Sequence, residues 1–280
     1  MIANLAGVPF PGDCTEYAKL WLSYDEQADR LAERGLGFDR DDLVEHLADV
    51  GYCRLSGYWY IYKQDSDVQG ESFTEGTTFA KVWDLYTFDR QLRFITLDAI
   101  ERVEIYMRTQ LAYRLAEQSG PFGFLNRSTL PNIDQKAYGH FMSKCFTAYD
   151  RSKTLFIEHF KKKYGDSHGL PPYWTLVNIM DFGMMPTLFR GSPNVVKKGI
   201  ADEIGIPAGV FESWLLTLNT VRNACAHHDR LWNKRLGNRA KIPRGRNEED
   251  LRRMGFYEGW EECPIWKKWM QGGENSAGKV

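Results

Sequence analysis

The amino-acid sequence predicts an all-α fold, and three stretches carry the prediction. Over residues 79–118, apolar side chains recur every three or four positions, which is the longest helical pattern in the chain. The same spacing returns over 210–221. Residues 23–50 predict a helical hairpin, because each half begins at a residue that caps helices well. We therefore expect a helical bundle built on helices at 79–118 and 210–233, with the hairpin packed at one side.

The first elements follow from their start and stop signals. Ser23 and Asp39 are the expected N-caps of the hairpin helices, and Gly35 ends the first of them. The next segment, 52–62, is rich in tyrosine and tryptophan, a composition that suits either a core or a surface on which nucleobases stack. An exposed loop is expected over 63–76.

The later elements are less regular. The long helix is expected to start at a threonine cap, and a bend near Asp89 would divide it into two helices. The remaining segments are, in order, a turn-rich connection (121–135), a helical stretch from 135 towards 160, a helix over 174–180, a loop with one short helix (186–209), and the helix at 210–233.

Composition divides the chain into three parts. Residues 1–20 carry prolines and glycines with little periodicity and are expected to form an N-terminal arm that docks on the body. Residues 21–235 form one helical domain, of which 21–76 is an N-terminal subregion. Residues 236–280 are a C-terminal extension that is basic at first and then aromatic.

Charge and cysteine content exclude several classes of protein. With 280 residues, 43% of them hydrophobic, the chain can bury a large core. A formal net charge of −1 excludes a uniformly basic nucleic-acid binder, so any contact with RNA needs a local basic patch. The five cysteines are widely spaced and form no C-x-x-C pair, which disfavours a disulfide framework and a zinc site.

Targeting and cofactor signals are absent from the sequence. No apolar run approaches the roughly 20 residues of a membrane span, and the N-terminus lacks the charged and apolar regions of a signal peptide. We therefore expect a cytoplasmic protein without a membrane partner. There is no Walker-type glycine loop and no metal-ligand spacing such as H-E-x-x-H, so we expect neither a metal nor another cofactor.

The stretch 221–233 concentrates residue types that carry chemistry. It follows an apolar helical pattern, so it lies in or at the end of that helix. At about 100° per residue, Asn223, His227 and Arg230 fall on one stripe. The long side chain of Arg222 reaches the same space from the flank. A cation, an amide and an imidazole are thereby clustered.

Further candidate site residues lie near this stretch and on the long helix. His228 projects about 100° from His227 and lies either in the site or in the core. Glu104 and Arg108 are four residues apart and are most simply an intrahelical ion pair; a functional alternative places them in the cleft beside His227. The basic segment that follows is either a phosphate-binding stretch or a solvated tail. Its cations are Arg235, Arg239, Lys241, Arg244 and Arg246.

Four segments resemble one family, in family order. The string Arg-Asn-x-x-x-His-His-x-Arg-Leu-Trp-Asn at 222–233 resembles the signature of HEPN-domain ribonucleases and, in full, that of the Abi-like (AbiD/AbiF) abortive-infection proteins of bacteria. The other segments are YCRLSGYW at 52–59, with Cys53 in place of the usual aromatic residue, LYTFDRQLR at 85–93, and LPPYW at 170–174 with DFG at 181–183. The resemblance covers residues 20 to 235 and implies a HEPN-like helical bundle.

The resemblance implies a metal-independent endoribonuclease of an abortive-infection phage-defence system. The 2′-hydroxyl of RNA supplies an internal nucleophile. His227 would transfer protons, Arg222 would stabilise the negative charge on the phosphorane, and Asn223 would orient the imidazole or the phosphate. HEPN ribonucleases place two such sets face to face and this chain shows one, so a homodimer with its cleft at the two-fold axis is expected.

Two other classes of function stay open. One is a non-catalytic RNA-binding protein that holds a small structured RNA. The other is a protein-interaction module, similar to an antitoxin, that uses the aromatic C-terminal segment. A regulatory small RNA or an antitoxin is therefore a candidate second partner.

Overall fold

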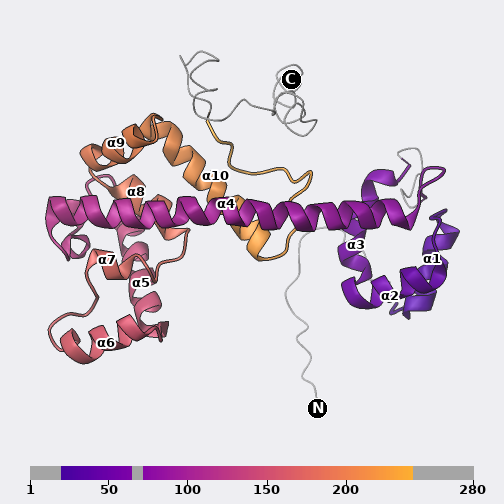
Figure 1. Ribbon diagram of the computed structural model, residues 1–280, viewed down its shortest axis with the longest axis horizontal. Coiled ribbons are helices and arrows are strands. Elements are labelled where there is room, and N and C mark those ends of the chain that lie inside the picture. Colours follow the sequence, from indigo (N-terminus) through magenta and orange to yellow (C-terminus); the bar gives the residue numbers. More distant parts are fainter. Residues whose placement is uncertain (1–19, 65–71, 242–280) are drawn as a thin grey trace, which may run out of the picture. The chain divides into compact units, whose positions relative to one another are not determined.

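The computed structural model describes residues 20–64 and 72–241 (Figure 1). Within these ranges it contains ten α-helices and no strand, so the predicted all-α fold is confirmed. None of the helices found there is both long enough and apolar enough to cross a membrane. Most of the predicted arm, 1–19, and most of the predicted extension, 242–280, lie outside the described residues.

The chain forms two compact units that divide after Leu92, within the long helix α4 (Phe79–Ser119). In its described residues, 20–64 and 72–92, the first unit holds three short helices and the first part of α4. The short helices are α1 (Tyr24–Glu33), α2 (Arg40–Val50) and α3 (Tyr52–Trp59), followed by a 3-10 turn at Tyr60–Tyr62. Ser23 and Asp39 cap α1 and α2 as predicted, because each side chain accepts a backbone N–H of the first turn.

The aromatic segment contributes to the core of the first unit. Tyr58 and Trp59 are buried there, which favours the core interpretation for these two rings, whereas Tyr60 and Ile61 are exposed. The Tyr58 hydroxyl donates to the carboxylate of Asp89, which is fully buried, at 2.7 Å. This hydrogen bond joins α3 to α4.

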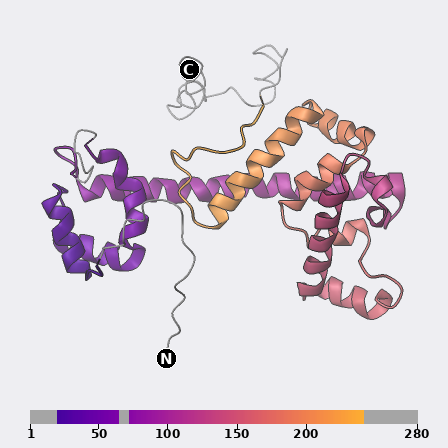
Figure 2. The ribbon, with the colours of Figure 1, turned by 180° about the vertical axis from the view of Figure 1, so that it is seen from behind.

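Over residues 93–241, the second unit builds one large core from the rest of α4 and six further helices. These are α5 (Gln135–Arg151), α6 (Leu155–Tyr164), α7 (Tyr173–Leu176), α8 (Met184–Gly191), α9 (Asn194–Glu203) and α10 (Ala208–Ala226). Helix α10 packs against α8 and α9, as both ribbon views show (Figures 1 and 2). Met107, Leu188 and Leu215 are among the residues that bring α4, α8 and α10 into this core.

Several predicted elements have different boundaries in the structure. Helix α4 is continuous through Asp89, where the sequence predicted a bend, because it contains neither proline nor glycine. The predicted stretch from 135 towards 160 is divided into α5 and α6 by a short non-helical segment, 152–154. The helix predicted at 174–180 is limited to the single turn of α7.

The segment 186–209 is mostly helical, although a loop with one short helix was predicted. Pro186 is the third residue of α8, where its missing N–H has no intrahelical acceptor, and Pro193 is the N-cap residue of α9. Prolines near helix starts are compatible with the helices that follow them. The sequence therefore predicted only one short helix where the structure has both α8 and α9.

Candidate functional site

The end of α10 is formed by a tight turn at the two histidines. His227 is the C-cap residue, and His228 lies in the left-handed region with a φ of 59°. The His228 N–H donates to the Cys225 carbonyl at 3.1 Å, and the Asp229 N–H donates to the Ala224 carbonyl at 2.8 Å. These two hydrogen bonds form a Schellman motif, which satisfies carbonyls that the helix end would leave without partners.

Because of this turn, only part of the predicted stripe of Asn223, His227 and Arg230 is present in the structure. Asn223 and His227 keep their expected relation, because the His227 N–H donates to the Asn223 carbonyl at 2.9 Å. Arg230 leaves the stripe, because the chain turns away from the helix at His228 and the helix predicted to reach 233 stops at Ala226. His228 is exposed, so the alternative that placed it in the core is wrong.

The turn is anchored to α4. Arg93 is buried on α4 and donates from its guanidinium to the Asp229 carbonyl at 3.4 Å. The Lys234 ammonium pairs with the Asp229 carboxylate at 2.9 Å. Arg93 is the last residue of the segment 85–93, so one residue of that segment contacts the turn after α10.

Glu104 on α4 brings together two arginines. Its carboxylate is 2.5 Å from Arg108 Nη2, which confirms the predicted intrahelical pair, and 3.9 Å from Arg222 Nε on α10. Arg108 Nη2 also donates to the Met180 carbonyl at 2.9 Å. The Glu104 side chain is only 12% exposed. One largely desolvated carboxylate therefore holds two cations, and the cluster keeps a formal charge of +1.

Two buried polar atoms, one in this cluster and one on α10, have no hydrogen-bond partner among the described residues. They are Arg108 Nε, a donor, and Asn219 Oδ1, an acceptor. Asn219 lies three residues before Arg222 on α10 and faces Gly183, where an added Cβ would lie 3.4 Å from Asn219 Oδ1. Buried polar groups normally have partners, so these two atoms are exceptions among the described residues. Asn219 was not predicted from the sequence, although it lies four residues before Asn223 on the same helix and that spacing could have pointed to it.

Within one chain the cluster and the histidine are separate. Among the described residues, no hydrogen bond or ion pair joins the His227 side chain to Glu104, Arg108 or Arg222. Arg222 and His227 are five residues apart at the end of α10, about 7.5 Å along the helix axis. Asn223 and His227 are both exposed, and Arg222 is partly exposed, so all three are accessible to a ligand.

The described part of the basic segment lies along α10. The indole N–H of Trp214 donates to the Lys241 carbonyl at 2.7 Å, and the Lys241 N–H donates to the Ser213 hydroxyl at 2.9 Å. The side chains of Arg235, Arg239 and Lys241 are exposed. Backbone contacts thus hold this segment while its cations face solvent. The predicted phosphate-binding residues Arg244 and Arg246 lie outside the described residues.

Comparison with known proteins gives one match. The model of a family described as Abi-like protein matches residues 45–233, which is more than half of the chain. The matched range contains the Glu104 cluster and the turn at His227 and His228, and it ends before the exposed cations of the basic segment. No curated protein and no solved structure matches the chain.

Proposed function

Because the chain belongs to the Abi-like protein family, whose members are associated with abortive infection and phage defence, we propose that it is a metal-independent endoribonuclease. The family supports the defence role, and the chemistry of the α10 end supports the activity. The observation that carries the proposal is that the end of α10 presents an exposed imidazole, His227, and a partly exposed guanidinium, Arg222, which contacts the largely buried Glu104 carboxylate on α4.

The reaction uses the nucleophile that RNA carries. The 2′-oxygen attacks the adjacent phosphorus, the bond from phosphorus to the 5′-oxygen breaks, and the fragments end in a 2′,3′-cyclic phosphate and a 5′-hydroxyl. The proton lost by the 2′-hydroxyl and the proton gained by the 5′-oxygen balance. An imidazole can both accept and donate a proton in general acid–base catalysis, and His227 has that role in the proposal.

Arg222 stabilises the charge that develops on the phosphorane. A guanidinium is charged at all physiological pH values and offers a planar fork of donors. The Glu104 carboxylate, which also binds Arg108, limits the positions of the Arg222 side chain. Pre-orientation of this kind reduces the entropy that substrate binding would otherwise cost. Glu104 and Arg108 are thus positioning residues in the proposal, and Asn223 orients the imidazole or the phosphate.

We further propose that the active form is a homodimer. Each chain carries one Arg222–His227 set, and the HEPN ribonucleases that the motif resembles use two sets across a two-fold axis. Proton removal and proton donation would then come from two imidazoles. RNA is the proposed substrate and partner.

A second candidate function is RNA binding without cleavage. Three exposed cations along α10 favour this function, because cations bind RNA phosphates without any catalytic step. They are Arg235, Arg239 and Lys241. The two functions differ in what His227 does, because only cleavage requires its imidazole.

The proposal predicts that His227→Ala and Arg222→Ala each abolish RNA cleavage without unfolding the protein. General acid–base catalysis contributes about 10²–10⁴-fold, so the loss in the His227 variant should be unmistakable. His140→Ala is the matched control, because His140 is an exposed histidine on α5. The measurement is the rate at which each variant cleaves an RNA mixture, and circular dichroism checks that each variant is folded. Wild-type cleavage by His227→Ala would refute the mechanism; RNA binding without cleavage under any condition would favour the second function.

A further inference from the structure

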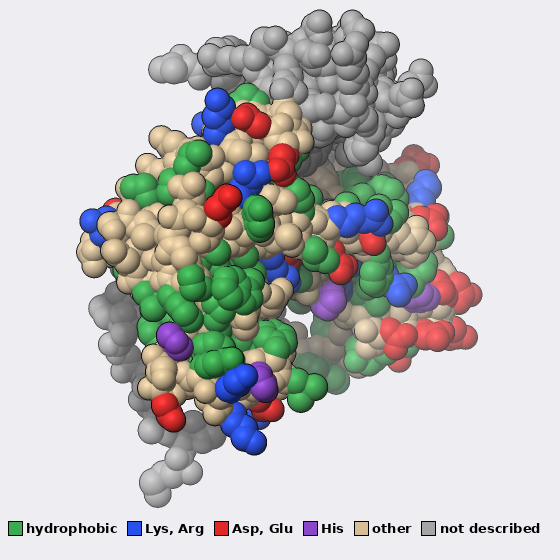
Figure 3. All heavy atoms as spheres, turned by 60° about the vertical axis from the view of Figure 1, so that its left-hand side comes forward, with side chains coloured by type: hydrophobic (Ala, Val, Ile, Leu, Met, Phe, Trp, Pro, Cys, Tyr) green, Lys and Arg blue, Asp and Glu red, His purple; other side chains and the backbone are tan. Residues whose placement is uncertain are grey.

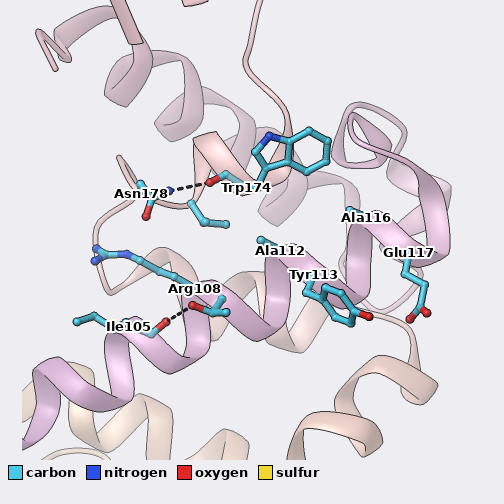
Figure 4. A pocket seen from close by; sticks show the side chains of 10 residues that line it. Ile105, Arg108, Ala112, Tyr113, Ala116, Glu117, Trp174 and Asn178 are labelled. Carbon is cyan, nitrogen blue, oxygen red and sulfur yellow. Dashed lines mark hydrogen bonds between the residues drawn. The ribbon is translucent and has the colours of Figure 1, made fainter. Parts of the chain in front are cut away.

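A groove opens on the second unit beside the Glu104–Arg108 pair. It encloses about 670 Å³, a volume within the range of about 300–1,000 Å³ that small-molecule sites occupy. One wall is α4 from Ile105 to Glu117, and the other is formed by Trp174, Val177 and Asn178 (Figure 4). Of these lining residues, only Arg108 has a role in the proposed cleavage.

Two exposed aromatic rings form the sides of this groove. Figure 4 shows Trp174 and Tyr113 on opposite sides, with Ala112 and Ala116 between them. Trp174 is 56% exposed and Tyr113 is 67% exposed, although both rings have large apolar faces. Aromatic faces beside an apolar floor are the surfaces on which unpaired bases of single-stranded nucleic acids stack.

The two ends of the groove differ in charge. Arg108 and Asn178 lie at one end and Glu117 at the other (Figure 4). The Asn178 amide donates to the Trp174 carbonyl at 2.7 Å, which fixes the amide and leaves its oxygen as an acceptor. The Arg108 end attracts a phosphate, and the Glu117 carboxylate repels one, so a nucleotide has one preferred direction in the groove.

Arg108 connects the groove to the proposed cleavage site. It lines the groove and is paired with Glu104, and Glu104 also contacts Arg222. Its Nη2 donates to the Glu104 carboxylate and to the Met180 carbonyl, so these two contacts hold the guanidinium beside the groove. A strand whose phosphate lies at the two arginines can therefore place a neighbouring base between the aromatic rings.

We propose that this groove binds an unpaired nucleobase of the RNA, stacked against Trp174 and Tyr113, with its backbone phosphate at the Arg108 end. This inference rests on the proposed function, because it names single-stranded RNA as the substrate class of that site. Base-paired RNA does not fit, because its bases are already stacked and paired inside the helix. The groove thus directs cleavage to single-stranded RNA.

A second groove provides the control. It encloses about 770 Å³, shares Trp174 with the first groove, and includes Leu155, Phe156 and His159. Figure 3 shows a face on which hydrophobic side chains gather with histidines and basic side chains. The arginines of the Glu104 cluster do not line the second groove. Leu155 is 85% exposed, so its substitution removes an apolar surface residue and leaves the first groove intact.

The test measures binding separately from cleavage. Full-length protein carrying His227→Ala is titrated against a fluorescein-labelled, unstructured single-stranded RNA, its duplex, and the same strand with abasic sites, and anisotropy gives each Kd. Tyr113→Ala and Trp174→Ala should each weaken single-strand binding by about 5- to 160-fold, the range expected for loss of one stacked base. Trp174→Phe should restore most of it, and Leu155→Ala should leave it unchanged.

The outcomes separate this inference from the proposed function. Single-strand affinity that survives both Tyr113→Ala and Trp174→Ala overturns the base-binding groove, even if the wild-type protein cleaves RNA. Equal affinity for the strand with abasic sites overturns it as well. Affinity that depends on both rings, in a protein that never cleaves RNA, supports the groove and refutes the nuclease. Because Tyr113 is more exposed than Trp174, its variant remains informative if Trp174→Ala fails to fold.

Discussion

His228 occupies a backbone position that most residues avoid. Its φ of 59° lies in the left-handed region, which costs L-residues about 1–2 kcal/mol and which glycine adopts freely. The Schellman hydrogen bonds of Cys225 and Ala224 depend on this conformation. Strained positions of this kind are concentrated at functional sites. The second histidine of the motif therefore has a backbone role that is distinct from any role of its imidazole.

This distinction predicts the effect of His228→Gly. The variant should unfold at the same or a higher temperature than wild type, because glycine relieves the backbone cost, whereas His228→Ala should not be stabilised. Thermal unfolding followed by circular dichroism measures both. If His228→Gly retains cleavage, the imidazole is dispensable; a large fall in melting temperature would contradict the backbone interpretation.

At the scale of elements, Glu104 joins α4 to α10. Its carboxylate binds Arg108 on its own helix and contacts Arg222 on α10, and it is 12% exposed. Removing the charge leaves two cations in a partly desolvated site, so breaking such a contact costs more than breaking a surface pair.

Glu104→Gln should therefore destabilise the protein by about 2 kcal/mol, in the range found for hydrogen bonds to charged groups. The matched variant is Glu101→Gln on the same helix, which is exposed and should change stability by less than about 0.5 kcal/mol. Urea unfolding compares the two. Cleavage should also fall in Glu104→Gln, because Arg222 loses its orientation. Equal stability of the two variants would show that Glu104 does not link the helices.

Local patterns predicted part of this architecture. Ser23 and Asp39 were recognisable as caps, and the Glu104–Arg108 pair followed from its spacing, because these interactions join residues three or four positions apart. The end of α10 could not be found in this way, because a histidine occupies the left-handed position that glycine usually marks. The approach of Arg222 to Glu104 depends on how α4 and α10 pack, and no local spacing encodes it.

At the scale of the whole molecule, the proposal requires two chains. One Arg222–His227 set supplies one imidazole, and two proton transfers are needed in each cleavage. We expect light scattering to show a dimer at micromolar concentration, with or without RNA. A specific interface of this kind buries more than about 1,000 Å². A monomer that cleaves RNA at a rate independent of protein concentration would exclude the two-fold site.

The central claim is that this protein cleaves RNA through its own side chains and the 2′-hydroxyl of the substrate. The most direct measurement is incubation of purified wild-type protein with RNA in EDTA, followed by chemical identification of the new ends. The mechanism predicts undiminished cleavage, upstream fragments that end in a 2′,3′-cyclic phosphate, and downstream fragments that begin with a 5′-hydroxyl. Loss of cleavage in EDTA, or fragments with 3′-hydroxyl and 5′-phosphate ends, would contradict it.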